Sequence, residues 1–311
     1  MSLSVFTKLT SSVLVRDLMI SAYKPVGSEM TVEAADRHLS DCGDMRLREN
    51  VPCRVTNSCG QVVGWVDPSQ VREALYDEVK EHGWAENEDG TYASGNEPRK
   101  HVRDIMQTVE PSHLVSGDTT LFGAVNIFAS GDRDWFWVLD GPDICGTLHA
   151  SCFKRPLFAV CLLAMVLQLE QAALDLISCD FRDTNRHWSY LSDERKEKAR
   201  KQYGIVYKRG KKNPEAPTER LLLEMTTMID KCTIVKKSQL LPHRAPGEIH
   251  EFFALAEKVR NDCAHGRIHS LRRHEILGFA QDCHRYIMEL NNATEVKKEG
   301  LMLPNEEPDE P

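Results

Sequence analysis

The sequence predicts a multidomain α+β protein: a repeated α/β unit followed by an all-α helical bundle. A pentapeptide occurs twice, as VRDLM at 15–19 and as VRDIM at 102–106. Two pairs of strand-like segments lie in the first half of the chain, and a long apolar helix begins at Pro156 with no comparable strand pattern after it. The expected parts are the repeated unit, the bundle and a tail: 1–155, 156–291 and 292–311.

Each copy of the repeat is expected to run β-α-β-β-α over roughly 60 residues. In the first copy Thr31 caps a helix, and VPCRVTN and QVVGWVD form strands around a turn that contains Gly60. In the second copy Asp118 or Thr119 caps the helix, and a turn at Gly141 joins the last two strands. The copies and the acidic, solvated loop between them are placed at about 13–80, 100–155 and 81–100.

This order resembles the CBS (cystathionine-β-synthase) domain, which usually occurs as a tandem pair. The two VRD pentapeptides, the T-x-x-x-A-x-x-x-[LF] helices and the last strands GWVDPSQ and GTLHASC carry the resemblance, which covers about residues 13–155. It implies either a site for an adenine nucleotide, with Asp67, Asp118 and His149 as candidate ligand contacts, or a dimerisation scaffold. Neither copy has the family's Ser/Thr followed by Asp, and Asp67 would repel a phosphate, so both alternatives stay open.

The second half is expected to form an all-α bundle. PLFAVCLLAMVLQLEQAALDLISC is a long apolar helix, interrupted by polar residues such as Glu170, which favour a core or interface helix over a membrane span. Three predicted helices follow, and the third ends in the motif described below: DERKEKARKQYG with Asp193 as cap, TERLLLEMTTMIDKCTIVKKS with Thr218 as cap, and GEIHEFFALAEKVRNDCAHG. SLRRHEILGFAQDCHRYIMELN is the last helix, and the Pro-rich, acidic tail at 292–311 is expected to be disordered.

The net charge of −8 is unevenly distributed along the chain. Residues 1–150 carry −10, residues 151–291 carry +6 and residues 292–311 carry −4, so the predicted bundle is the basic part. The ten cysteines form no C-x-x-C pair, so a zinc site is not expected, and free thiols indicate a reducing compartment. With no signal-peptide pattern and no uninterrupted apolar stretch of about 18 residues, we expect a cytoplasmic protein without membrane contact.

A candidate catalytic motif, RNDCAHG, begins at Arg260. Gly266 is expected to end the helix and to leave His265 at its terminus. An Arg that grips a phosphate beside a His that moves a proton suits cleavage of RNA by its own 2′-OH, which needs no metal or cofactor. The same spacing recurs at Arg182 and His187 in a polar stretch; only the first match ends a strongly amphipathic helix.

Here the chain resembles the HEPN (higher eukaryotes and prokaryotes nucleotide-binding) superfamily, whose ribonuclease members carry R-[polar]-x(3–5)-H late in a helical bundle. EKVRNDCAHG matches this pattern, and the resemblance covers about 156–291. It implies that Arg260 and His265 are catalytic, that Asn261 orients the site or contacts the phosphate, and that two copies form a homodimer. Many members have lost catalysis, so an ion-paired Arg260 and a helix-capping His265 are the alternative. Asp262 is a candidate partner for Arg260.

A basic segment at 195–212 carries nine Lys and Arg, two Tyr and one acid. Cations interleaved with aromatic rings suit RNA, because they neutralise phosphates and stack on bases. A solvated helix and loop is the alternative. The candidate RNA contacts are Lys208, Arg209, Lys211 and Lys212.

Taken together, the residues and the resemblances predict a metal-independent endoribonuclease that is regulated or dimerised by a CBS-like pair. Its expected partners are RNA, a second copy of the chain and an adenine nucleotide at the pair. The alternative is a non-catalytic, ligand-sensing scaffold whose bundle binds RNA or a protein. Toxin, phage-defence and regulatory roles are all compatible with the resemblance.

Overall fold

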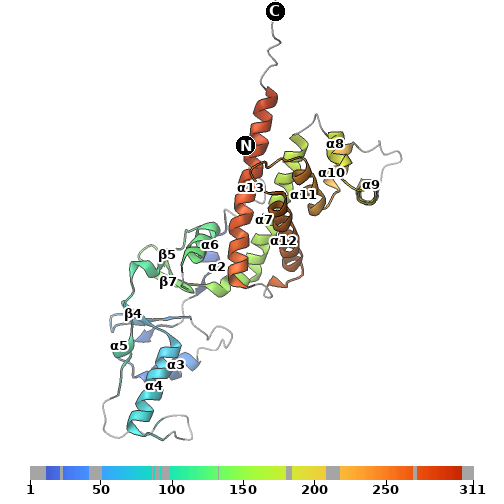
Figure 1. Cartoon of the computed structure of the whole chain (residues 1–311). Coiled ribbons are helices and arrows are strands. Elements are labelled where there is room, and N and C mark those ends of the chain that lie inside the picture. Colours follow the sequence, from blue (N-terminus) through green and yellow to red (C-terminus); the bar gives the residue numbers. More distant parts are fainter. Residues whose placement is uncertain are drawn as a thin grey trace, which may run out of the picture. The chain divides into compact units, whose positions relative to one another are not determined.

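The computed structural model describes residues 12–21, 24–41, 51–85, 87, 92, 99–131, 133–179, 184–207, 218–268 and 272–302. The chain divides into two compact units (Figure 1). The α/β unit comprises Leu14–Ala124 and Ser130–Cys152. Of the described residues, the helical unit comprises 12–13, Val125–Ala129 and those from Phe153 onward.

Among the described residues, one sheet of the α/β unit has three strands in the order β2-β3-β4. Its strands are β2 (Val26–Gly27), β3 (Cys53–Thr56) and β4 (Val62–Val66); β2 pairs parallel with β3, and β3 pairs antiparallel with β4. This sheet forms one lobe of the α/β unit together with the helices α3 (Val32–Asp41), α4 (Pro68–His82) and α5 (Val102–Ile105). Buried apolar side chains from strands and helices form its core: Val26, Val32, Ala35, Cys53, Val55, Val66, Val71, Leu75 and Val102.

The other sheet has, in the described part of the chain, four strands in the order β1-β7-β6-β5. They are β1 (Ile20–Ser21), β5 (Leu114–Ser116), β6 (Trp135–Asp140) and β7 (Asp143–His149). This lobe also holds α2 (Val15–Leu18), the first part of α6 (Leu121–Ser130) and the 3-10 turns η2 (Pro111–His113) and η3 (Ala150–Lys154). Both predicted strand pairs are confirmed, and Gly60 and Gly141 adopt the positive φ angles, 78° and 58°, that their turns need.

The two VRD segments (residues 15–19 and 102–106) are exchanged between the lobes. The first leads into β1, which pairs with β7 of the second copy through Ile20 and Thr147. The second leads into Gln107, which bridges Trp65 in β4 of the first copy. The repeat in space therefore differs from the repeat in sequence, because each copy completes the sheet of the other.

Equivalent contacts hold both VRD segments in place. Arg16 forms an ion pair with Asp118, and Arg103 forms one with Glu29 at 2.6 Å. Each segment's aspartate accepts a hydrogen bond from the backbone N–H three residues before it, at 2.8 Å in both copies. The valines at 15 and 102 are fully buried. Each of the three residues that the V-R-D triplets share thus has a structural contact in both repeats.

The helix caps of the α/β unit correct one prediction. Thr31 caps α3 as expected, accepting a hydrogen bond from the Ala34 N–H at 3.2 Å. The cap of α6 is Thr120, which accepts from the Gly123 N–H at 3.2 Å, and not Asp118 or Thr119. Both predicted caps contact the first VRD segment instead: the Asp118 carboxylate pairs with Arg16, and the Thr119 carbonyl accepts a hydrogen bond from the Val15 N–H at 2.8 Å.

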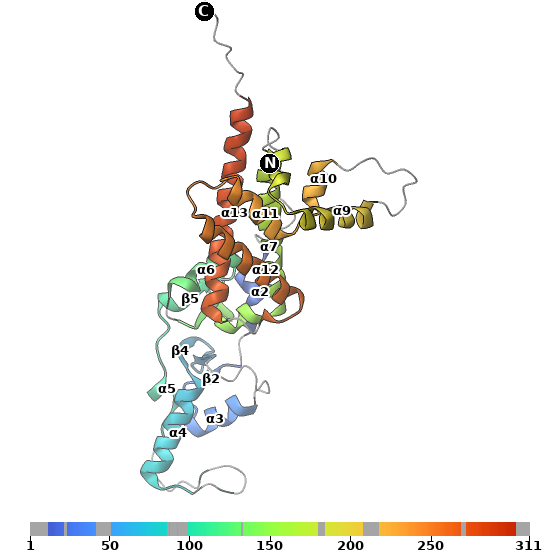
Figure 2. The same cartoon turned by 45° about the vertical axis from the view of Figure 1, so that its right-hand side comes forward.

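The helical unit is built on α7 (Pro156–Cys179), against which α11 (Met228–Lys237), α12 (Pro246–Ala264) and α13 (Arg273–Met302) pack. Figure 2 shows the shorter helices α9 (Asp193–Tyr207) and α10 (Glu219–Glu224) next to each other. Among its described residues the unit also contains α8 (Thr184–Ser189). By length and composition α7 could cross a membrane, but 56% of its most apolar 18 residues are buried inside the protein.

Several predicted boundaries in this unit are wrong. The helix expected from Thr218 to Ser238 is two helices, because Thr227 and Asp230 form a capping box that starts α11 anew. Ser192 caps α9 in place of Asp193. The predicted tail is helical up to Met302, where α13 ends, since Thr294 is buried and Lys298 pairs with Glu295 at 3.0 Å. Residues 303–311 lie outside the described part.

Candidate functional site

The end of α12 carries the predicted catalytic motif. The helix ends at Ala264, His265 is its C-cap residue, and Gly266 follows with a φ of 68°. The Arg267 N–H closes the end by donating to the Asp262 carbonyl at 2.7 Å, a Schellman-type geometry that a left-handed glycine permits. The predicted end of the helix at Gly266 is therefore confirmed, and it places His265 at the C-terminal end of α12.

Arg260 lies in the last turns of α12 with 28% of its side chain exposed. Its Nη1 atom is 3.6 Å from Oε2 of Glu170 on α7, and its Nη2 atom is 3.5 Å from Oε1 of Glu257, one turn earlier on α12. Both distances exceed those of ordinary charge-assisted hydrogen bonds, about 2.7–2.9 Å. The two carboxylates therefore attract and orient the guanidinium without occupying its N–H groups at close range.

Glu170 has a closer partner on another helix. Its Oε1 atom lies 2.8 Å from Nζ of Lys231 on α11, which also donates to the Thr226 carbonyl at 2.7 Å. Lys231 is 2% exposed, so its charge is almost completely removed from water. A buried ammonium is tolerated when it is paired and hydrogen-bonded, and Glu170 and Thr226 meet that need.

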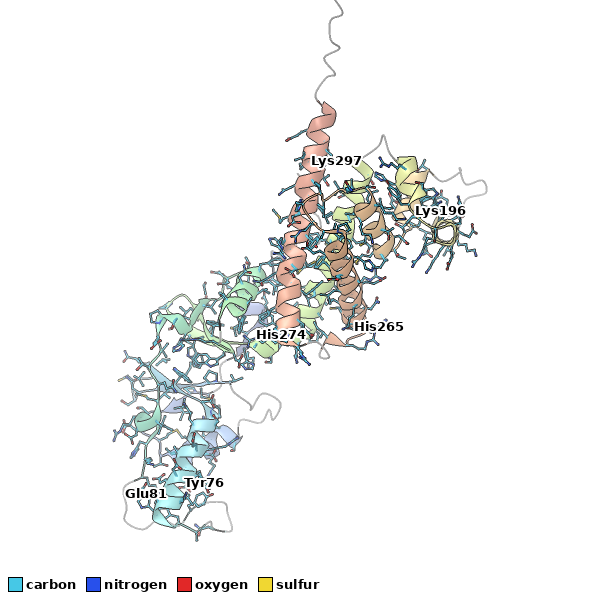
Figure 3. The ribbon with its side chains drawn as sticks, viewed as in Figure 1. Tyr76, Glu81, Lys196, His265, His274 and Lys297 are labelled. Atoms are coloured by element: carbon cyan, nitrogen blue, oxygen red, sulfur yellow. The ribbon has the colours of Figure 1, made fainter. Side chains whose placement is uncertain are left out.

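Asn261 and His265 are both exposed. Figure 3 shows His265 at the end of α12 and His274 at the start of α13. On an ideal α-helix, positions 260 and 265 lie about 140° apart, so the side chains of Arg260 and His265 do not share one helix face. Asn261 is next to Arg260 in sequence but points to solvent, whereas Arg260 is held toward Glu170.

Two neighbours of the motif have structural roles. Asp262 does not pair with Arg260 as considered above; its carboxylate lies 3.4 Å from Nε of Arg267. Burial, with the charge of Asp262 as a smaller cause, raises the pKa of the Cys263 thiol to about 11. A thiol with that pKa is scarcely ionised at neutral pH, so Cys263 is unsuited to nucleophilic chemistry.

Of the second R-x4-H match, Arg182 and His187, the structure describes only the histidine. The prediction that His187 lies in a polar loop is wrong. His187 lies buried in α8, where its Nδ1 atom is 2.9 Å from Oγ of Ser238. It is therefore a core histidine. Arg182 lies outside the described residues.

The candidate RNA contacts Lys208, Arg209, Lys211 and Lys212 also lie outside the described residues. The described cations of α9 are partly engaged by acids: Lys196 is 3.3 Å from Asp193, and Arg195 is 3.6 Å from Asp230. Lys198 and Lys201 are exposed on the same helix. The described part of the predicted basic segment, on α9, therefore holds exposed cations as well as ion-paired ones.

The candidate ligand residues of the α/β unit occupy three different elements. Asp67 is the N-cap of α4, and its Oδ1 atom accepts from the N–H and the hydroxyl of Ser69 at 2.7 and 2.6 Å. Asp118 lies in the turn before α6 and pairs with Arg16. His149 ends β7, with Nδ1 2.8 Å from Oγ of Ser151. All three therefore have contacts within the protein.

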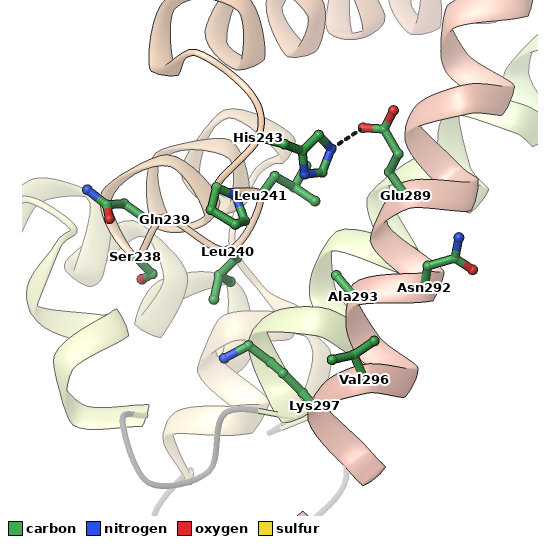
Figure 4. Close-up of a pocket in the computed structure, with 11 residues that line it drawn as sticks. Ser238, Gln239, Leu240, Leu241, His243, Glu289, Asn292, Ala293, Val296 and Lys297 are labelled. Carbon is green, nitrogen blue, oxygen red and sulfur yellow. Dashed lines mark hydrogen bonds and ion pairs between the residues drawn. The ribbon is translucent and has the colours of Figure 1, made fainter. Parts of the chain in front are cut away.

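A cavity of about 460 Å³ lies between the α11–α12 loop and α13 (Figure 4). One wall holds His243, whose Nε2 atom is 3.1 Å from Oε2 of Glu289. Glu289 also accepts two hydrogen bonds from Arg244, at 3.0 and 2.6 Å, and these bonds hold its pKa below the usual range. None of the residues singled out in the sequence lines this cavity.

Sequence reasoning missed Lys231. A signal was present: Lys231 lies three residues after Met228 and four before Val235, on the apolar side of its helix. A lysine at such a position is placed on the buried face and requires a carboxylate partner there. Within the described parts of the chain, no cluster of three or more His, Cys, Asp and Glu side chains could hold a metal ion.

Comparison with known proteins gives structural likeness only. No protein-family model and no curated protein matches the chain. Among solved structures, an uncharacterized conserved protein of Pyrococcus horikoshii is 18% identical, with 47% of this chain and 55% of that chain covered at a TM-score of 0.30. This chain therefore spans about half of that protein's length.

Two further solved structures are CBS proteins by description. CBSX2 in complex with AMP is 18% identical, with 48% of this chain and 98% of that chain covered at a TM-score of 0.33. A conserved CBS-domain protein of Thermoplasma acidophilum is 16% identical, with 49% and 75% covered at a TM-score of 0.30. The likeness is to CBS-pair proteins over about half of the chain, and at this level it identifies neither a ligand nor an activity.

Proposed function

We propose that the protein is a metal-independent endoribonuclease of the HEPN type, with its catalytic groups on α12. In this proposal Arg260 binds the scissile phosphate and His265 moves the proton. The 2′-OH attacks the adjacent phosphorus, its proton passes to a base, and the 5′-oxygen leaves with a proton, so that a 2′,3′-cyclic phosphate and a 5′-OH end are formed. The observation that carries the proposal is the exposed His265 at a fixed helix end, five residues after a partly exposed, oriented Arg260.

A second copy of the chain would complete the site. Arg260 and His265 do not share a helix face within one chain, so a facing motif from a partner would bring a histidine to the phosphate bound by an arginine. The basic segment that begins in α9 would extend the RNA contact. We place the reaction in the cytoplasm.

We further propose that the α/β unit is a CBS pair that regulates or dimerises the bundle. The exchange of the two VRD segments supports this, because each sequence repeat contributes backbone pairing to the sheet of the other repeat. An adenine nucleotide is the proposed ligand. Asp67, Asp118 and His149 remain the candidate contacts, and Asp118 is favoured among them because its side chain is 75% exposed although it pairs with Arg16.

A non-catalytic scaffold is the second candidate function, favoured by one observation. Arg260 lies near two carboxylates of its own chain, as a purely structural arginine would. In that case the bundle would bind RNA or a protein without cutting it. Binding without cleavage by the wild-type protein distinguishes this candidate from the ribonuclease.

The proposal is tested by incubating purified protein with single-stranded RNA in EDTA and analysing the product ends. We expect cleavage with 2′,3′-cyclic phosphate ends, and no cleavage of the same oligonucleotide carrying 2′-O-methyl groups, since the methylated oxygen cannot attack. RNA that is bound but stays intact contradicts the ribonuclease and favours the scaffold. Cleavage of the methylated strand contradicts the 2′-OH mechanism.

A further inference from the structure

We propose that Lys231 is a positioning residue that keeps Arg260 available for phosphate by occupying Glu170. This inference rests on the proposed role of Arg260 as the phosphate-binding group. It concerns a lysine on a different helix that is too deeply buried to contact RNA itself. Lys231 would act only through the carboxylate that it shares with Arg260.

The geometry of Glu170 supports this arrangement. One carboxylate oxygen, Oε1, is 2.8 Å from Nζ of Lys231, and the other, Oε2, is 3.6 Å from Nη1 of Arg260. The hydrogen-bonded partner of Glu170 is therefore the lysine, and the arginine is attracted from a longer distance. An Arg and a carboxylate without other partners commonly form two parallel hydrogen bonds. The distance of 3.6 Å between Arg260 and Glu170 is longer than in such a pair.

Burial makes it unfavourable to break the contact between Lys231 and Glu170. Lys231 is 2% exposed and the side chain of Glu170 is 20% exposed, whereas that of Arg260 is 28% exposed. Leaving a buried charge without its partner is strongly unfavourable, so Glu170 stays with Lys231 when the exposed side of Arg260 meets a ligand. The N–H groups of Arg260 on that side remain available for the two oxygens of a phosphate.

Replacing Lys231 by methionine removes this restraint. Glu170 would then turn toward Arg260 and close on it as a bidentate pair, since no other described cation lies within 4.0 Å of that carboxylate. Phosphate would have to compete with Glu170 for the guanidinium. The double variant Lys231→Met with Glu170→Gln removes the Glu170 charge as well and leaves Glu257 as in wild type, so Arg260 should again be as available as in wild type.

The test measures binding of a 2′-O-methyl RNA, which cannot be cleaved by 2′-OH attack, by fluorescence anisotropy at several salt concentrations. We expect Lys231→Met to bind about tenfold more weakly, with a salt slope smaller by about 0.7, the loss of one phosphate contact on a single strand. The double variant should regain wild-type affinity and slope. Lys237→Met, at an exposed lysine of the same helix, should change neither.

A second measurement is independent of RNA: the rate at which phenylglyoxal modifies Arg260, followed by mass spectrometry of the peptide. We expect slower modification in Lys231→Met and recovery in the double variant, in protein whose circular dichroism is unchanged. If Arg260 reacts equally fast in wild type and Lys231→Met, or if the double variant stays as slow as the single one, the inference is overturned. An expected phenylglyoxal pattern in a protein that never cuts or binds RNA would overturn the proposed function alone.

Discussion

A Cβ atom at Gly146 would lie 2.6 Å from Sδ of Met19. Met19 is the last residue of the first VRD segment, and Gly146 lies in β7 of the second copy. The equivalent contact joins Gly64 of β4 to Met106 of the second VRD segment, where a Cβ would lie 3.1 Å from Sδ and 2.6 Å from the Gln107 carbonyl oxygen. Glycine at these two positions lets each segment lie flat on the strand of the other copy.

We therefore expect Gly146→Ala to lower the free energy of unfolding of the α/β unit by about 1–3 kcal/mol, the usual cost of adding a methyl group to a filled site. Gly278→Ala is the matched control. Nothing lies within 4 Å of a Cβ at Gly278, and alanine is more stable than glycine in the interior of a helix such as α13. Urea unfolding checks both. Equal midpoints for Gly146→Ala and wild type would show that the methionine contact is not tight.

The exchange shows where sequence reasoning stops. The pentapeptide repeat, both strand pairs and the Thr31 cap could be predicted, because they depend on residues close together in the chain. The partner of each VRD segment could not, because Arg16 and Asp118 are about a hundred residues apart and either lobe offers an acidic turn. Pairing over that distance is decided by the packing of the folded chain.

A second prediction concerns Asp67. Asp67→Ala removes the cap of α4 and should cost about 1 kcal/mol of stability, whereas Asp67→Asn should retain most of the capping. The loss should be the same with and without AMP, because the carboxylate is already occupied by Ser69. Thermal melting with AMP added checks this. If AMP raised the melting temperature of wild type and of Asp67→Asn but not that of Asp67→Ala, Asp67 would bind the nucleotide and the prediction would be wrong.

A third prediction concerns thiol reactivity. Because burial raises the pKa of Cys263 to about 11, as it does for Cys161 and Cys232, these thiols should react slowly with iodoacetamide at pH 8. Cys59 is exposed in the turn between β3 and β4 and should be labelled before these three. Peptide mass spectrometry at early times gives the order. Rapid labelling of Cys263 would contradict the burial described for it.

A fourth prediction concerns acid stability. Hydrogen bonds from Arg244 lower the pKa of Glu289 below 4.5, so its ionised form stabilises the fold above that pH, and this contribution is lost as pH falls through the lowered pKa. Wild type should therefore exceed Glu289→Gln in stability at pH 7, with the difference shrinking below pH 4.5. Urea unfolding from pH 7 to pH 3 measures it. A difference that stays constant over this range contradicts the prediction.

The candidate site was only partly accessible from the sequence. The helix, its glycine stop and the spacing of Arg260 and His265 follow from local pattern, and the structure confirms the helix and the stop. The partners of Arg260 do not follow, since Glu170 is ninety residues earlier and Asp262, adjacent in the motif, pairs elsewhere. Which acid an arginine meets depends on how helices pack, and that information is not local.

The most direct test of the central claim is the initial rate of RNA cleavage in EDTA by wild type, Arg260→Ala and His265→Ala, at equal concentrations and with matched circular dichroism. Removing a general acid or base costs typically 10²–10⁴-fold, so we predict that His265→Ala loses at least about a hundredfold in rate. Arg260→Ala should lose a comparable amount, because the phosphate is no longer held. Full activity in His265→Ala would contradict the account.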